Sequence, residues 1–384
     1  MLTSAAFSFT LRQVNKLPGP AECCERGGRT YGCAGQHGTR LARGGAAARE
    51  RGHMNPQRIV DMASAFYESC VLFAAVDAGI FAALAKKPGS DADAIAAACG
   101  LSRRGCRLLM DACVAVGLLE KEENLYSNAP EAAAFLVPGS PADLSGALRY
   151  NRDVYAAWGK LAEFVRSGRP VERPETHLGA DPERTRSFVM AMHHRALGIG
   201  RAALDQVDLA AGSVILDVGG GPGTYSMLLA EKRQLARCRV IDLPAVVKVA
   251  RELAAGHPAG DRLELIAGDY RLMPFPPDND AVLFFGVLHQ ETPDSIRDLL
   301  RRAAGALRAG GRVFILDMMT DATRATPRFS ALFAVNMALT TENGWVFSDQ
   351  ELKQWLEEAG FTEFSCRPLP PPMPHWLASA KKPL

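Results

Sequence analysis

The chain has 384 residues, of which 48% are hydrophobic and 22% charged, and its formal net charge is +2. This length accommodates two domains with separate cores, and the composition is that of an ordinary globular protein. So small a net charge gives no support for binding nucleic acid, and no apolar stretch is expected to reach the roughly 18 to 20 residues that span a bilayer. We therefore expect a cytoplasmic protein that binds neither nucleic acid nor a membrane.

The nine cysteines form no Cys-x-x-Cys pair. A chain of this size does not need disulfide bonds, so we expect reduced thiols. Cys99, Cys106 and Cys113 recur every seven residues, which predicts buried positions near one helical face. A metal site is the weaker alternative because no histidine accompanies them, and we expect none.

Residues 1–53 contain Gly and Ala clusters, eight Lys or Arg against three Glu, and no periodic apolar pattern. This composition predicts a disordered segment, or a non-native extension ahead of a functional start at Met54. The segment lacks the apolar core of a secretory signal, and an Arg-rich organellar transit peptide remains the alternative.

Residues 54–150 predict a helical domain. Residues 59–84 have apolar positions at helical spacing and almost no charge, which predicts a helix that is buried or lies in a subunit interface. A short helix, a turn at Gly100, a helix with Ser102 as its N-cap and a hairpin around residues 122–124 follow. This is the winged-helix pattern, which alone would suggest DNA binding. Because the second helix turns apolar after its arginines, we favour a packing or dimerisation domain over DNA contact.

The rest of the chain predicts a helical connector and then an α/β domain. Residues 145–200 are expected to be mostly helical, broken by a Pro- and Gly-rich loop at 168–182. From residue 206 onward, short apolar strands alternate with amphipathic helices, which predicts a mostly parallel sheet covered on both faces. The expected strands are VILDV, ARCRVID, LELIAG, DAVLFFG and RVFILDM, with helices beginning near residues 225, 245, 293 and 348. The segments FTEFSCRPLP and HWLASAKK are expected to form an antiparallel edge hairpin.

The strongest local signal is VILDVGGGPGT at residues 214–224, where a strand leads into a glycine turn before a helix. Glycine lets the backbone turn sharply and approach a ligand, although nicotinamide and flavin enzymes also use such a loop. Asp217 stands where its carboxylate can accept a hydrogen bond from a cationic amino-acid group, and Pro222 removes an N–H that a pyrophosphate would use. These features favour a methyl donor over a dinucleotide. The glycines assigned to the cofactor are Gly219, Gly221 and Gly223.

Two further acids follow the next two strands. Asp242, ahead of Leu243, can accept hydrogen bonds from both ribose hydroxyls, and Asp269 with Tyr270 can flank adenine. Each acid taken alone could also be a helix N-cap. Three acids at successive strand ends, on one edge of the sheet, favour a ligand site.

Together, DVGGGPG, VIDLP, AGDY, GVLH and LRAGGRVFILDMM resemble the ordered motifs of the small-molecule O-methyltransferases, which include caffeate, acetylserotonin and hydroxyindole methyltransferases and bacterial tailoring enzymes. The resemblance runs from residue 59 to the C-terminus. It implies a Rossmann-like methyltransferase sheet, an all-helical winged-helix-like domain that forms an intertwined homodimer, and S-adenosyl-L-methionine as cofactor. RSFVMAMHHRA resembles the family's linker helix, so residues 151–205 are expected to line the pocket of a small-molecule acceptor.

The resemblance assigns the general base to His289, at the end of the fourth strand. A phenol with a pKa of about 10 is a poor nucleophile at neutral pH, whereas imidazole can accept its proton as the oxygen attacks the methyl carbon. Asp317, at the end of the fifth strand, aligns with the family's acidic residue that orients the histidine and stabilises the imidazolium.

The sequence departs from the family pattern at two places near this base. The family's second supporting carboxylate falls at about Val346 here, and the family's Asp or Asn after the histidine is replaced by Gln290 and Glu291. Glu291 either substitutes for the missing catalytic carboxylate or only begins the helix that Pro293 enters, and we favour the second interpretation.

The acceptor pocket is expected to contain flexible and aromatic side chains that suit a flat apolar molecule. Each of these residues could alternatively belong to the core. They are Met192, Phe329, Phe333 and Met337, with Asn336 and Thr341 as candidates to orient polar substituents.

These observations predict an O-methyltransferase that acts on a hydroxyl, most simply a phenolic one, of a small aromatic or polyketide-like acceptor. Three alternatives remain. An altered base would fit a C-methyltransferase acting on an activated ring, and the winged-helix pattern would fit a non-catalytic ligand sensor. A nicotinamide dehydrogenase is disfavoured by the chemistry of the glycine loop.

Overall fold

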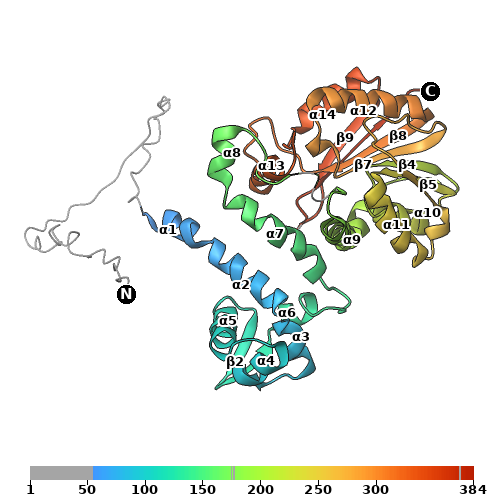
Figure 1. Cartoon of the computed structure of the whole chain (residues 1–384). Helices are drawn as coiled ribbons and strands as arrows, with labels where there is room; N and C mark the ends of the chain where they lie inside the picture. Colours follow the sequence, from blue (N-terminus) through green and yellow to red (C-terminus); the bar gives the residue numbers. More distant parts are fainter. Residues whose placement is uncertain (1–54, 174, 176–177, 372) are drawn as a thin grey trace, which may run out of the picture. The chain divides into compact units, whose positions relative to one another are not determined.

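The computed structural model describes residues 55–173, 175, 178–371 and 373–384 (Figure 1). The predictions for residues 1–53 and for a start at Met54 lie outside these residues. By its internal contacts the chain divides into Met1–Pro56 and Gln57–Leu384, and the second unit contains both sheets.

The apolar segment at residues 59–84 is divided into three helices instead of one. They are α1 (Gln57–Ser64), α2 (Phe66–Asp77) and α3 (Ile80–Lys86). The chain turns between α2 and α3 at Gly79, whose φ of 71° is a conformation that residues with a Cβ rarely adopt. No residue of α1 is buried in the single chain. Ile59, Val60, Met62, Phe66 and Tyr67 are each at least 49% exposed.

The helix-turn-helix and wing predicted next are present. Helices α4 (Ala92–Cys99) and α5 (Arg103–Ala115) flank Gly100, and the Ser102 hydroxyl accepts a hydrogen bond from the Gly105 N–H as the N-cap of α5. Strands β1 (Ser90–Asp91), β2 (Leu119–Glu122) and β3 (Leu125–Asn128) form an antiparallel sheet in the order β1-β3-β2, and α6 (Pro130–Phe135) follows.

The cysteine series does not lie on one helix. Cys106 and Cys113 are buried on α5, where burial raises the pKa of the Cys113 thiol to about 11, but Cys99 ends α4. The prediction that the three cysteines share one helical face is therefore wrong, because the turn at Gly100 separates Cys99 from the other two. All six described cysteines are free, and the described residues include no His, Cys, Asp and Glu group that could hold a metal ion.

We expected no apolar stretch long enough to cross a membrane, and this prediction is wrong for segment Gln57–Asp77. An 18-residue stretch of this segment has a mean hydropathy of 1.6, and the segment is 21 residues long because Ala65, between α1 and α2, has helical dihedral angles. By length and composition alone it could span a bilayer. A single helix that passes this test, among the described residues, is weak evidence for a membrane protein.

Helices α7 (Ser145–Trp158), α8 (Leu161–Ser167) and α9 (Pro182–Leu204) connect the small sheet to the large one. The side chain of Asp181 accepts hydrogen bonds from the Glu183 and Arg184 N–H groups and caps α9. Helix α9 packs against α7, α10 (Thr224–Arg233) and α11 (Pro244–Ala255), so the connector is part of the fold of the large sheet.

The large sheet has seven strands in the order β6-β5-β4-β7-β8-β10-β9. The first five are parallel, and β10 runs antiparallel to both of its neighbours. The C-terminal hairpin is antiparallel as expected, with β9 at the edge and β10 between β8 and β9. The strands are β4 (Val214–Val218), β5 (Arg237–Asp242), β6 (Leu263–Ala267), β7 (Asn279–Phe285), β8 (Leu307–Asp317), β9 (Thr362–Pro368) and β10 (Trp376–Lys381).

Helices cover both faces of this sheet (Figure 1). Helices α12 and α14 pack on one face around Phe284 and Trp355, and α9 and α10 pack on the other around Leu204 and Leu283. The strand order reverses between β4 and β7, and in such sheets the crevice at the carboxyl ends of these strands is where ligands bind. The helices are α10 (Thr224–Arg233), α11 (Pro244–Ala255), α12 (Pro293–Ala306), α13 (Arg328–Thr340) and α14 (Asp349–Glu358), with short 3-10 turns η2 (Gly260–Arg262) and η3 (Leu288–Gln290). Helix α13 has no counterpart among the expected elements.

The N-terminus of α14 provides a test of local stability. The Ser348 hydroxyl accepts from the Glu351 N–H while the Glu351 carboxylate accepts from the Ser348 N–H, forming a capping box. We expect Ser348→Ala to lower the free energy of unfolding by about 1 kcal/mol, which lowers the melting temperature by about 2 to 4 °C. Gln350→Ala, at an exposed position of the same helix, is the control and should change little. Equal melting temperatures for the two variants in a thermal unfolding experiment would contradict the role of the cap.

Candidate active site

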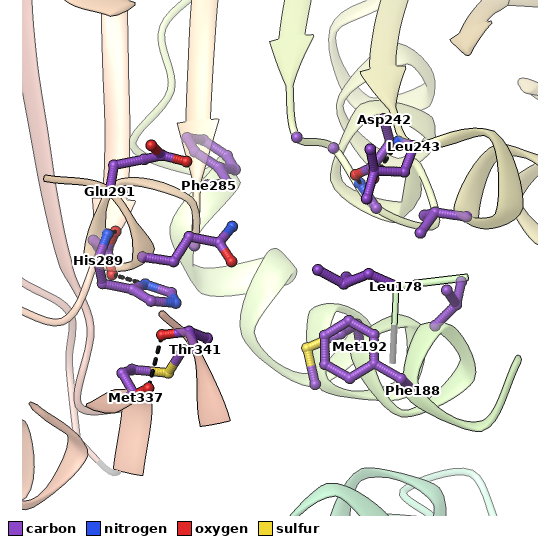
Figure 2. Close-up of a pocket in the computed structure, with 18 of the residues that line it drawn as sticks. Leu178, Phe188, Met192, Asp242, Leu243, Phe285, His289, Glu291, Met337 and Thr341 are labelled. Carbon is purple, nitrogen blue, oxygen red and sulfur yellow. Dashed lines mark hydrogen bonds and ion pairs between the residues drawn. The ribbon is translucent and has the colours of Figure 1, made fainter. Parts of the chain in front are cut away.

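A cavity of about 470 Å³ lies at the carboxyl edge of the large sheet, and helices α9 and α13 contribute to its walls. Figure 2 shows Asp242 and Leu243 at the upper right, Leu178, Met192 and Phe188 below them, and His289, Met337 and Thr341 on the opposite side. Residues predicted for the cofactor and residues predicted for the acceptor therefore line one continuous space.

The glycine loop lines this cavity through Gly219, Gly220 and Gly221. A Cβ at Gly219 would lie 2.7 Å from the Val287 side chain, so the loop can follow this path only without one. Gly223 does not line the cavity. Its φ of 72° instead lets the chain enter α10 directly from the loop.

Asp217 is 1% exposed and lies beneath the glycine loop. One carboxylate oxygen accepts a hydrogen bond of 2.6 Å from the Ser226 hydroxyl, and the other has no partner among the described residues. Burial raises the pKa of Asp217 to about 7. A buried oxygen without a partner is suited to a cationic donor supplied by a ligand, although Asp217 itself is not among the cavity-lining residues.

Asp242 ends β5 and faces the cavity beside Leu243. Its two oxygens accept hydrogen bonds from the Gly221 and Leu243 N–H groups, both at 2.7 Å. Burial raises the pKa of this carboxyl to about 6, against the lowering effect of these two bonds. Carboxylate oxygens can accept more than one hydrogen bond each, so Asp242 retains capacity for a ligand diol.

Asp269 and Tyr270 line the cavity but have partners within the protein. The Arg271 guanidinium donates to the Asp269 carboxylate, with a shortest distance of 2.8 Å, and this bond lowers the pKa of Asp269. The Tyr270 hydroxyl donates to a Glu291 oxygen at 2.7 Å. Burial, followed by the Glu291 charge, raises the Tyr270 pKa well above its usual value, so the phenol stays protonated.

His289 and Asp317 form the central polar contact of the site. His289 Nδ1 lies 2.6 Å from Asp317 Oδ1, and the His289 backbone N–H donates to Oδ2 at 3.2 Å. Asp317 is 1% exposed, and the imidazole contacts the Phe333 ring edge-to-face with centroids 5.2 Å apart. With Nδ1–H directed at the carboxylate, Nε2 is left as the basic nitrogen.

Glu291 makes no hydrogen bond to His289 among the described residues. Its carboxylate accepts from the Tyr270 hydroxyl and from the Ser295 hydroxyl, and it stands one residue before Thr292, the N-cap of α12. Val346, where the family's second carboxylate would fall, is buried in an apolar cluster instead. The geometry thus agrees with the interpretation that Glu291 precedes the helix, and it adds a contact with Tyr270.

The predicted acceptor residues separate into two groups. Met192, Phe333, Met337 and Thr341 line the cavity. Phe329 does not: it is 51% exposed and stacks on Phe333 with ring centroids 6.4 Å apart. Asn336 is also absent from the cavity wall, because its amide bonds Trp158 and Tyr150 and so joins α13 to α7.

The polar residues of the cavity wall that the sequence reasoning missed include Arg195 and His375. Arg195 lies three residues after Met192 on α9, and this spacing places both on one helical face, so it could have been found. His375 precedes β10 in a segment with no recognisable motif, so only the folded chain brings it to the cavity.

Comparisons with known proteins agree with this architecture. The O-methyltransferase domain matches residues 158–362, and the O-methyltransferase dimerisation domain matches residues 60–138. The chain is 32% identical over 314 residues to 3-hydroxy-5-methyl-1-naphthoate 3-O-methyltransferase of Streptomyces sahachiroi, covering 80% of this chain and 90% of that protein. It is 32% identical over 313 residues to the tetracenomycin polyketide synthesis 8-O-methyl transferase of Streptomyces glaucescens, covering 80% and 92%.

Among solved structures, human N-acetylserotonin methyltransferase in complex with S-adenosylmethionine superposes with a TM-score of 0.78 at 27% identity. The match covers 87% of this chain and all of the human chain. The chain therefore belongs to the family of S-adenosylmethionine-dependent small-molecule O-methyltransferases and contains that family's dimerisation domain.

Proposed function

We propose that this chain transfers the methyl group of S-adenosylmethionine to a phenolic hydroxyl of a small aromatic or polyketide-like acceptor, with His289 as the general base. The contact of 2.6 Å between His289 and Asp317 at the cavity carries this proposal. A sensor protein would have no use for an imidazole whose tautomer is fixed by a buried carboxylate. The two Streptomyces relatives, by their names, methylate hydroxyls of a naphthoate and of a polyketide.

The residues of the glycine loop and the two buried acids fit the cofactor. Asp242 would accept hydrogen bonds from the ribose hydroxyls, Leu243 and Tyr270 would flank the adenine, and the unpartnered oxygen of Asp217 would receive the ammonium group. Asp269 would keep Arg271 in place at the adenine end. When bound, the cofactor supplies a methyl group on a sulfonium sulfur, which is already a good leaving group.

His289 performs the proton transfer that makes the acceptor oxygen nucleophilic. As the oxygen–carbon bond forms, the O–H bond breaks and its proton moves to Nε2 of His289. Asp317 holds the ring in the required tautomer and stabilises the imidazolium that results. Met192, Phe333 and Met337 would hold a flat acceptor in the cavity, and positioning of this kind supplies much of the remaining rate acceleration.

The activity of a protein with His289 substituted distinguishes O-methylation from C-methylation and from a non-catalytic sensor. We expect His289→Ala to lower kcat by about 10² to 10⁴-fold, because general base catalysis is removed, while the Kd for S-adenosylhomocysteine changes little. Asp317→Asn should lower kcat as well, since the amide cannot balance the imidazolium charge. Single-turnover assays and calorimetric titration measure the two effects. Activity that survives in His289→Ala would favour the C-methyltransferase alternative, and a folded wild-type protein that does not bind S-adenosylhomocysteine would remove the proposal.

The raised pKa of Asp242 predicts a pH dependence of cofactor binding. Above about pH 6 the carboxylate accepts hydrogen bonds from both ribose hydroxyls, and below that pH it is protonated and loses an acceptor site. We expect the affinity for S-adenosylhomocysteine to fall as the pH decreases from 7.5 to 5, by up to about tenfold per pH unit. Asp242→Asn should bind weakly at every pH and lose the dependence near pH 6. An unchanged profile in this variant would assign the dependence to another group.

A second copy of the chain is proposed to cover α1 and α2, whose apolar side chains are exposed in the single chain. The match to a dimerisation domain over residues 60–138 supports this assignment. A cytoplasmic location without nucleic-acid or membrane binding belongs to the same proposal.

The oligomeric state is measured by light scattering at micromolar concentration. We expect a homodimer for the wild type and a monomer for Ile59→Glu combined with Met62→Glu, because buried charges would disrupt an apolar interface. Leu272→Glu changes a residue that is 85% exposed on the large domain and should leave the dimer intact. A monomeric wild type, or one that binds lipid vesicles through this segment, would contradict the proposal.

A further inference from the structure

The base lies on a short turn that is weakly held by its own hydrogen bonds. His289 belongs to η3, which has three residues and follows the end of β7. Backbone hydrogen bonds of 3.1 and 3.2 Å close this turn, and bonds of the 3-10 type have poorer geometry than those of an α-helix. Contacts from other segments are therefore needed to keep the imidazole against Asp317, where Nδ1 and Oδ1 are 2.6 Å apart.

Trp345 donates one hydrogen bond to this turn and one to the residue directly after it. Its backbone N–H donates to the His289 carbonyl at 2.9 Å, and its indole Nε1–H donates to the Glu291 carbonyl at 2.7 Å. A single residue thus holds the backbone on both sides of Gln290. Both acceptors are backbone carbonyls, so these bonds leave the imidazole itself free for proton transfer.

The segment that contains Trp345 is in turn attached to the chain that follows β8. Thr320, three residues after Asp317, donates its backbone N–H to the Phe347 carbonyl at 3.1 Å. The Trp345 ring packs against the rings of Phe347 and Trp355, with centroids 6.2 and 6.1 Å apart. Trp345 therefore connects the segment after β8, the strand of the carboxylate, to the turn after β7, which carries the base.

Trp345 has no place in the wall of the cavity, although Thr341, Glu342 and Asn343 just before it line that wall. An effect of Trp345 on the reaction therefore passes through the position of the base and does not require contact with a ligand. The next residue, Val346, is where the family's second carboxylate would fall, and it is buried in an apolar cluster.

We propose that Trp345 is a positioning residue for the base, which holds the turn so that the His289 ring stays against Asp317. This inference rests on the proposed function, in which His289 removes the proton of the acceptor. Two hydrogen-bond donors of Trp345 thereby support the base directly beside the position where Val346 replaces a supporting carboxylate.

Two matched variants separate this role from packing. Trp345→Phe removes the indole donor but keeps the backbone N–H and an aromatic ring. Trp355→Phe is the control, because Trp355 belongs to the same aromatic cluster, loses the same group, and makes no hydrogen bond to the turn among the described residues. Thermal unfolding verifies that both variants are folded.

The measurement is the exchange with water of the proton on Nδ1 of His289. It is observed by NMR in protein with isotope-labelled histidine and is assigned by its absence from His289→Ala. The exchange rate reports how often the ring leaves Asp317. We expect exchange to be about three- to tenfold faster in Trp345→Phe, the effect of losing one hydrogen bond, and unchanged in Trp355→Phe. With 2-naphthol as a phenolic probe, kcat of Trp345→Phe should fall by a similar factor at an unchanged KM.

Exchange at the wild-type rate in Trp345→Phe would overturn the proposal. An equal increase in Trp355→Phe would do the same, because the cause would then be lost packing, and so would a raised KM at constant kcat, which would indicate a role in substrate binding. Failure of the proposed function is distinct, since a folded wild type would then not bind S-adenosylhomocysteine. Proton exchange is measured without cofactor or acceptor and decides the role of Trp345 even if 2-naphthol is not methylated.

Discussion

The pairing of β7 with β8 is the constraint on which the site depends. Phe285 lies opposite Leu316 in this parallel pair, and the Gly286 N–H donates to the Leu316 carbonyl at 2.8 Å. Both strands therefore end at the same level, and the turn after β7 brings His289 over Asp317. A shift of the register by one residue would send alternate side chains to the opposite face and separate the carboxylate from the imidazole. The apolar core that holds this register thus also holds the distance between base and carboxylate.

Two acids predicted to bind the cofactor, Asp217 and Asp242, are buried, and burial disfavours their ionised forms. Burial raises the pKa of Asp217 to about 7 and that of Asp242 to about 6, both above the usual value of a free carboxyl. A carboxyl whose pKa is higher in the folded chain than in the unfolded chain lowers stability as the pH rises through that interval. Hydrogen bonds and charge from a ligand would favour the ionised forms and offset this cost. The burial that raises these two pKa values therefore also strengthens the interaction of the ionised carboxylates with a cationic, hydroxylated ligand.

Patterns that involve neighbouring residues were predictable, whereas the choice of partners was not. Alternation of strands and helices was sufficient to predict the sheet and the edge that binds ligands. It was not sufficient to show that the Tyr270 hydroxyl would bond Glu291, 21 residues further along the chain. Phe329 and Phe333 share one face of α13, yet only Phe333 lines the cavity, because Phe329 lies one turn nearer the N-terminus of the helix and tertiary packing decides which turn meets the cavity. His375 reaches the cavity through the insertion of β10 between β8 and β9, which no local pattern indicates.

His289 has one carboxylate partner, Asp317, among the described residues, and apolar side chains lie near this pair. Glu291 is bonded to Tyr270 and Ser295, and Val346 packs with Met318 and Phe333 where a second acid would otherwise stand. Electrostatic attraction is stronger where the effective dielectric constant is low, so apolar surroundings strengthen the contact between Asp317 and the His289 ring. The same surroundings supply the apolar surface that a flat aromatic acceptor requires. With Val346 in this apolar cluster, the orientation of the His289 ring depends on Asp317 as its carboxylate partner among the described residues.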